Sequence, residues 1–260
     1  MILDAFKFTN NLFSAHFSKY LLVVFPVFII IFIANLLMPS VQGNEFGTTT
    51  SFNYQELVSN LFMVYASILA ILLTDDIYKE RKRNISSYFS IGALLYFKVI
   101  IITAISIFLI VLLLVPSVGL AIFLTGSPTE KTTASLLLAG LLFFILVLPI
   151  PYVAVRLSFA SYLAAIFNER IFDSFSKSIE ITEGKGWKVL GYILAMVVPL
   201  MFIMILALIG PAFFLLPENM YAYMGLTLVL TCILTIYMTI YIYRLLLNLM
   251  DTSHESIEIK

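Results

Sequence analysis

The stretch VIIITAISIFLIVLLLVPSVGLAIFLTGSPT, residues 99–129, contains no charged side chain at any position. An α-helix needs about 20 predominantly apolar residues to cross the hydrocarbon core of a bilayer, and this stretch exceeds that length. A strand of a membrane β-barrel would instead alternate apolar and polar residues over about ten positions. The run therefore predicts a transmembrane helix, which satisfies its backbone hydrogen bonds internally.

Five other stretches also lack Asp, Glu, Lys and Arg, and each can hold a helix of the same kind. The six runs are residues 20–44, 57–74, 99–129, 132–155, 189–217 and 219–243. The chain is 62% hydrophobic and 12% charged, whereas a soluble domain is about half apolar and a quarter charged. We therefore expect an all-α, polytopic membrane protein with about six transmembrane helices. Residues 1–250 form one transmembrane domain and residues 251–260 a short cytoplasmic tail.

The basic residues predict the orientation of these helices. Six spans place both termini on the same side, and fourteen of the fifteen lysines and arginines fall on that side, leaving only Lys131 on the other. Because cytoplasmic loops carry the excess of basic residues, both termini are predicted to be cytoplasmic. The first run is too long for the apolar part of a signal peptide and no Ala-x-Ala-like site follows it, so we expect it to be retained.

Three cytoplasmic segments share a design, an amphipathic helix followed at once by a long apolar run. Each ends in an aromatic residue and a lysine, which suits a helix lying in the headgroup region with an anchor at its end. The predicted interfacial anchors are Phe17, Lys19, Phe97, Lys98, Trp187 and Lys188. The pattern predicts a threefold repeat of interfacial helix and hairpin. The alternative is that any cytoplasmic start of a membrane helix selects aromatic residues and lysine.

Residues 176–191, SKSIEITEGKGWKVLG, resemble a segment of the YciC-like family of bacterial inner-membrane proteins. A looser similarity reaches the membrane domains attached to some glycerophosphodiester phosphodiesterases. The matching positions are Ser178, Thr182, Gly184 or Gly186, and Trp187. The resemblance implies a multi-pass protein of the bacterial cell (inner) membrane. It implies no catalysis, because the phosphodiesterase activity belongs to a separate soluble module.

Threonines recur every four residues in the last run, at 227, 231, 235 and 239, so they share one face of a helix. Thr227, Thr231, Thr235 and Thr239 could line a groove for a lipid or solute, which Tyr237 would broaden. Alternatively, each hydroxyl bonds the carbonyl one turn back in its own helix.

Pro149-Ile150-Pro151 should split the fourth helix, because proline removes a helical hydrogen bond and clashes with the preceding turn. The continuation carries Arg156, the remaining candidate for the groove. If this continuation stays in the membrane, Arg156 is a buried charge and a functional candidate. If it turns into the interface, Arg156 is an anchor. The acidic residues nearest to it in sequence are Glu169 and Asp173.

Nothing in the sequence resembles a catalytic centre, a metal site or a cofactor site. His16 and His254 lie near opposite ends, and the single cysteine, Cys232, sits in an apolar run. Asp75 and Asp76 precede a basic cluster, which predicts a solvated loop in contact with anionic lipid. We therefore expect neither an enzyme nor a bound cofactor, and the zero net charge gives no sign of nucleic-acid binding.

These features predict a non-enzymatic membrane protein in envelope homeostasis or lipid handling, with membrane lipids as partners. One alternative is the membrane subunit of a transporter for a small apolar or amphipathic solute, with an ATPase contacting residues 157–187. Another is a structural or regulatory factor for immunity or assembly, whose partner is a second membrane protein.

Overall fold

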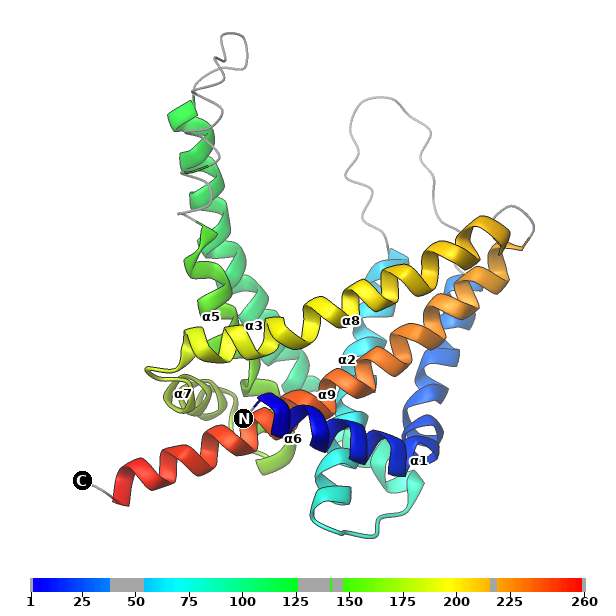
Figure 1. Cartoon of the computed structure of the whole chain (residues 1–260), viewed down its shortest axis with the longest axis horizontal. Coiled ribbons are helices and arrows are strands. Elements are labelled where there is room, and N and C mark those ends of the chain that lie inside the picture. The colour runs from blue at the N-terminus through cyan, green and yellow to red at the C-terminus, as the bar shows by residue number, and fades with distance from the viewer. Residues whose placement is uncertain (1, 38–53, 126–140, 142–146, 216–218, 259–260) are drawn as a thin grey trace. The chain divides into compact units, whose positions relative to one another are not determined.

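The computed structural model describes residues 2–37, 54–125, 141, 147–215 and 219–258, and Figure 1 shows the whole chain. All regular secondary structure within these ranges is helical. The helices are α1 (Ile2–Leu37), α2 (Tyr54–Tyr78), α3 (Ile85–Thr125), α5 (Pro149–Ser158), α6 (Ala160–Phe167), α7 (Ile171–Ile181), α8 (Gly186–Leu215) and α9 (Met220–Glu258). The predicted all-α class is confirmed.

Within the described residues, six helical segments are long and apolar enough to cross a membrane: Ile2–Leu37, Gln55–Tyr78, Ile85–Pro116, Pro149–Phe167, Gly186–Ile209 and Met220–Asp251. Large apolar side chains on α3 and α8, such as Phe108 and Phe202, are more than 60% exposed. Water does not tolerate so much contiguous apolar surface, whereas lipid does. The chain is therefore a multi-pass helical membrane protein, as predicted.

The fourth predicted run, 132–155, falls mostly outside the described residues, as does Lys131. The segment of spanning length is instead Pro149–Phe167, which comprises α5 and α6 on either side of Phe159. A turn at Leu148 precedes Pro149, where α5 begins. Proline suits the first helical position, since its missing N–H would have no helical partner there. The segment before residue 147 lies mostly outside the described residues, so the predicted split of the fourth helix at Pro149-Ile150-Pro151 stays a prediction.

The three predicted amphipathic segments join their apolar runs in different ways. In α1 the backbone leaves helical geometry at His16 (φ −124°, ψ 17°), just before the anchor pair Phe17 and Lys19. A turn over residues 182–185 likewise separates α7 from α8. In contrast, α3 continues through Lys98 without a break, so no separate interfacial helix ends there. Neither glycine nor proline occurs between positions 93 and 115 to interrupt it.

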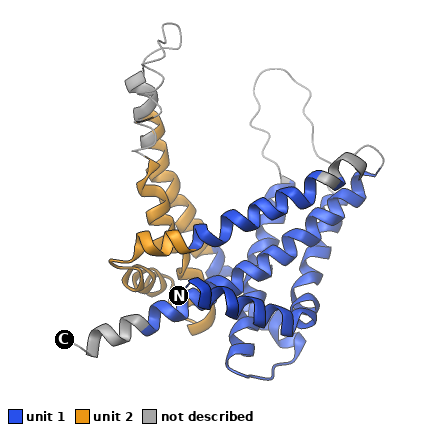
Figure 2. Ribbon diagram, viewed as in Figure 1, with its two compact units in different colours: residues 1–100, 193–260 blue, residues 101–192 orange. Residues whose placement is uncertain are grey.

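The described chain divides into two compact units, residues 1–100 with 193–260 and residues 101–192 (Figure 2). In the first, α1, α2 and α9 pack on one another, burying side chains such as Tyr20, Leu69 and Ile240. In the second, α5, α6 and α7 pack together, with Ile102 of α3 in the same apolar cluster. The single domain predicted for residues 1–250 stays a prediction. Residues 251–258 of the predicted tail continue α9.

Candidate functional site

A groove of about 290 Å³ lies between α1, α2 and α9 in the first compact unit. Its lining residues are Phe28, Ile31, Asn35, Ser59, Met63, Met224, Thr227, Leu228 and Thr231. Both Phe28 to Asn35 on α1 and Met224 to Thr231 on α9 cover seven helical steps, or about 10 Å along the axis. The groove therefore runs along the helices for roughly two turns.

One end of the groove is polar. The Ser59 hydroxyl donates a 3.0 Å hydrogen bond to Oδ1 of Asn35, and Gln55 Nε2 donates to the Asn35 carbonyl at 3.1 Å. These bonds tie the last turn of α1 to the first turns of α2. The other lining side chains are largely apolar, including two methionines whose flexible thioethers adapt to irregular occupants. The groove thus has a polar end and an apolar body.

The four threonine hydroxyls of α9 form hydrogen bonds within their own helix. This was the alternative prediction for them. The hydroxyls of Thr227, Thr231, Thr235 and Thr239 donate to the carbonyls four residues back, at 2.6, 2.8, 2.8 and 2.8 Å. Only Thr227 and Thr231 are among the residues that line the groove, whereas Thr239 is buried. Because each hydroxyl proton is used within the helix, these threonines offer an occupant their methyl groups and oxygen lone pairs.

Tyr237 does not broaden the groove, so that prediction is wrong. Its ring makes edge-to-face contacts with Phe6 and Phe13 of α1, with centroids 6.5 and 5.6 Å apart, and its hydroxyl donates to Asn10. At 100° per residue, position 237 faces away from 235 and 239. Tyr237 therefore packs α9 against the segment of α1 that precedes the break at His16.

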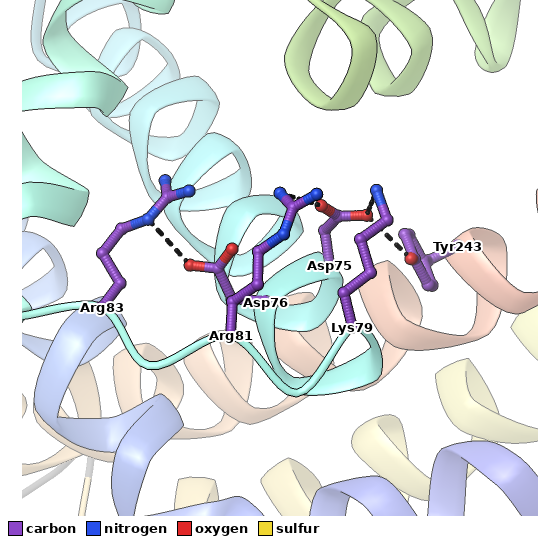
Figure 3. A network of polar contacts seen from close by, with 6 residues as sticks. All are labelled: Asp75, Asp76, Lys79, Arg81, Arg83 and Tyr243. Carbon is purple, nitrogen blue, oxygen red and sulfur yellow. Dashed lines mark hydrogen bonds and ion pairs between the residues drawn. The ribbon is translucent and has the colours of Figure 1, made fainter.

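The last turn of α2 contains a buried polar network, shown in Figure 3. Asp75 and Asp76 are only 4% and 1% exposed, so the prediction of a solvated loop is wrong for both. Asp75 contacts Lys79 at 2.6 Å and Arg81 at 3.7 Å, and it accepts a 2.9 Å hydrogen bond from the Tyr243 hydroxyl.

The second carboxylate of this network, Asp76, lies 3.0 Å from Nε of Arg83. A buried carboxylate costs several kcal/mol unless its charge is compensated, and both have cations within reach. One residue before Asp75, Thr74 donates to the Ala70 carbonyl, so the 2.8 Å contact with Tyr20 is a hydrogen bond that Tyr20 donates. The carboxylates are thus enclosed by α1 and α9 and held by basic residues of their own chain segment.

The backbone at the end of α2 directs these basic residues. The Arg81 N–H donates to the Asp76 carbonyl at 2.8 Å, and the Glu80 N–H donates to the Ile77 carbonyl at 3.2 Å. Glu80 has a φ of 54°, in the left-handed region. This combination is a Schellman motif, which ends a helix and usually places glycine at that position. The helix C-terminus also favours nearby cations, because its carbonyls carry partial negative charge.

In the second compact unit, Arg156 joins α5 to α7. Its guanidinium donates a 3.0 Å hydrogen bond to the Ile179 carbonyl and lies 5.7 Å from the centroid of the Tyr152 ring. In return, the Ser178 hydroxyl donates to the Arg156 carbonyl at 2.6 Å. Glu169, one of the two expected acidic partners, forms its ion pair with Lys177. Arg156 is therefore half-buried and bound to backbone and ring.

The residues that resemble the YciC-like segment surround the same junction. Thr182 donates to the Ser178 carbonyl at 2.8 Å, and Gly184 adopts a φ of +66° in the turn that follows. Gly186 begins α8 so close to Tyr152 that a Cβ there would lie 2.4 Å from the ring. Trp187 packs on that ring with centroids 5.3 Å apart. Each position thus has a structural role in turning the chain from α7 into α8.

The aromatic anchors Phe17, Phe97 and Trp187 are exposed, and their role at a membrane surface stays a prediction. Lys19 and Lys188 are also exposed, while Lys98 is half-buried. Cys232 is fully buried in α9, and the His254 side chain lies outside the described residues. Among the described residues, no group of three His, Cys, Asp or Glu side chains could hold a metal ion.

The comparisons with known proteins cover only one of the three helices that line the groove. A family model whose description is "Domain of unknown function (DUF7847)" matches residues 82–247, which is more than half of the chain. The match includes residues 220–247 of α9, with its threonines, but not α1 or α2. No match to the chain was found among the curated proteins or among the solved structures.

Proposed function

We propose a non-catalytic role in lipid handling for this chain, which belongs to the family of a domain of unknown function (DUF7847). In this proposal it is a protein of the bacterial cell membrane, and it contributes to envelope homeostasis by binding lipid within its helical bundle. The observation that carries the proposal is the groove between α1, α2 and α9.

The groove has the chemistry of a lipid site. An acyl chain needs an apolar channel along the helices, which Phe28, Ile31, Met63 and Leu228 supply. The ester region of a lipid needs hydrogen-bonding groups at one end. The Asn35 amide, whose oxygen accepts from Ser59, has nitrogen donors that bond no other described group. A polar end on an apolar body fits a lipid better than a small polar solute.

The distribution of the basic residues along the sequence predicts which end of the bundle faces the cytoplasm. With both termini cytoplasmic, α1 runs outward to Leu37 and α2 returns inward to Tyr78. In that arrangement Asn35 and Ser59 lie toward the outer leaflet, and Asp75 and Asp76 lie toward the cytoplasmic leaflet. The groove would then accept a lipid from the outer half of the bilayer.

Gentle extraction followed by native mass spectrometry and lipid analysis tests this proposal. The protein is expected to retain a stoichiometric lipid, and Thr231→Leu is expected to reduce the retained amount by filling the groove. Val229→Leu is the matched control, because Val229 is exposed on the same helix and does not line the groove. Equal retention by the two variants would contradict the proposal. Copurification of an ATPase with bulk lipid only would favour the transporter subunit instead.

A further inference from the structure

A second pocket, of about 240 Å³, opens beside the polar network at the end of α2. It is formed by α1, by the end of α2 with its following loop, and by the start of α3, all within the first compact unit. Its lining residues are Lys19, Leu22, Val23, Leu73, Ile77, Arg81, Lys82, Arg83, Ile85 and Tyr88. We call it the basic pocket.

Four of these lining residues are basic and none is acidic. Arg83 is bound to Asp76, and Arg81 approaches Asp75 only at 3.7 Å with more than half of its side chain exposed. Lys19 and Lys82 have no ion-pair partner in the part of the chain that the structure describes. The pocket therefore retains positive charge that the carboxylates beneath it do not neutralise.

The other residues that line the basic pocket are largely apolar. A solvated basic loop would not need such an apolar wall. Of its lining residues, Val23 and Leu73 are buried, whereas Leu22 and Ile85 are exposed. The Arg83 guanidinium lies 5.7 Å from the centroid of the Tyr88 ring, which limits where this side chain can move. Cations above an apolar wall match a ligand with an anionic group attached to hydrocarbon.

Part of this basic set is positioned before any ligand arrives. The Schellman turn fixes the backbone at Glu80 and Arg81, and the buried Asp76 fixes Arg83. Lys19 comes from the other side, three residues after the break at His16 in α1. A backbone turn and a guanidinium that are already positioned reduce the conformational entropy lost when an anion binds.

We propose that the basic pocket binds the phosphate headgroup of an anionic phospholipid. Lys19, Arg81 and Lys82 contact the phosphate oxygens, since guanidinium and ammonium groups are the usual phosphate ligands in proteins. The adjoining hydrocarbon lies against Leu22 and Ile85. This inference rests on the proposed function that the protein binds lipid, but it concerns a separate site, so the two can fail independently.

The test measures binding of short-chain phosphatidylglycerol and phosphatidylcholine to the full-length protein in a zwitterionic detergent. We expect wild type to prefer the anionic lipid. The double variant Lys19→Gln/Lys82→Gln should lose at least about tenfold in affinity for phosphatidylglycerol, because each lysine near an anionic lipid contributes about 1 kcal/mol. Its affinity for phosphatidylcholine should not change.

Lys7→Gln/Lys188→Gln is the matched control, because it removes the same charge from exposed lysines outside the pocket. Equal losses in the control and in the pocket variant would overturn the proposal in favour of a general charge effect. Glycerol 3-phosphate serves as the soluble probe. If it binds as tightly as phosphatidylglycerol, the site recognises a free phosphate ester and not a lipid.

The two lipid proposals have different signatures in the same assay. Thr231→Leu should reduce lipid retained in the groove and leave the preference for anionic lipid unchanged. Lys19→Gln/Lys82→Gln should remove the preference and leave retention in the groove unchanged. If wild type binds both lipids with equal affinity, the basic pocket proposal fails while the groove proposal stands. Thermal unfolding of every variant near the wild-type temperature would show that the effects are not due to misfolding.

Discussion

The hydroxyl of Tyr243 in α9 donates a 2.9 Å hydrogen bond to Oδ1 of Asp75 in α2, across 168 positions of sequence. Both side chains are nearly inaccessible, at 0% and 4% exposure. The same carboxylate oxygen lies 2.6 Å from Nζ of Lys79, so a tyrosine and a lysine share it. This hydrogen bond therefore joins α9, the last described helix, to α2 in the first third of the chain.

Tyr243→Phe should destabilise the protein by about 1.5–3 kcal/mol, because it removes a hydrogen bond to a buried charged group. The change keeps the ring, which packs edge-to-face on Tyr78 with centroids 5.8 Å apart. Thermal unfolding in detergent, followed by circular dichroism, measures the effect. Tyr221→Phe is the control, because Tyr221 is 64% exposed and its change should stay within about 0.5 kcal/mol. Equal unfolding temperatures for the two variants would show that the bond to Asp75 contributes nothing.

Glu80→Gly should stabilise the protein by about 0.5–1 kcal/mol. Glu80 holds a φ of 54°, which costs most side chains energy and costs glycine almost none. Urea or thermal unfolding measures the gain. Glu80→Ala separates the backbone effect from the loss of charge, since alanine keeps the unfavourable φ and should give no gain. A similar rise in both variants would mean that the carboxylate, and not the backbone, destabilises the turn.

Gly186→Ala should destabilise the second compact unit by about 1–3 kcal/mol, because its Cβ would lie 2.4 Å from the Tyr152 ring. That ring cannot simply move aside, since Trp187 packs on it and the Arg156 guanidinium lies near its face. Thermal unfolding again gives the measurement. Gly191→Ala, also in α8, meets nothing within 4 Å and should instead stabilise by about 0.5–1 kcal/mol.

A double-mutant cycle locates the cause of the Gly186 effect. On a Tyr152→Ala background the clash partner is gone, so Gly186→Ala should cost much less than in wild type. An unchanged cost would place the strain in the backbone at the start of α8 and not in the contact with Tyr152.

The membrane helices could be predicted from sequence because lipid imposes a local rule. Each span must be continuous, apolar and long enough, and nothing distant in the chain changes that requirement. The start of α5 at Pro149 follows an equally local rule, since proline lacks the N–H that an interior helical position would need. The boundaries of the fourth span were harder to predict, because Arg156 interrupts the apolar run and yet lies within the helical segment Pro149–Phe167.

The candidate site was less predictable, because it depends on contacts between distant segments. Asp75 and Asp76 stand beside four basic residues, which makes the segment resemble a solvated loop. Their burial depends on Tyr243 and on α1, which no local pattern reveals. Tyr237 is near the threonines in sequence but does not share their face of α9. Its angular position on α9, 200° from Thr235, was available from sequence and indicates the other face.

The basic pocket and the groove differ in how much of the chain they require. Every residue that lines the pocket lies between Lys19 and Tyr88, so the segments that form it are complete once the first third of the chain has been synthesised. The groove needs Thr227 and Thr231, and Asp75 gains its tyrosine partner only when α9 has inserted. During synthesis from the N-terminus, the basic pocket can therefore assemble before the groove exists.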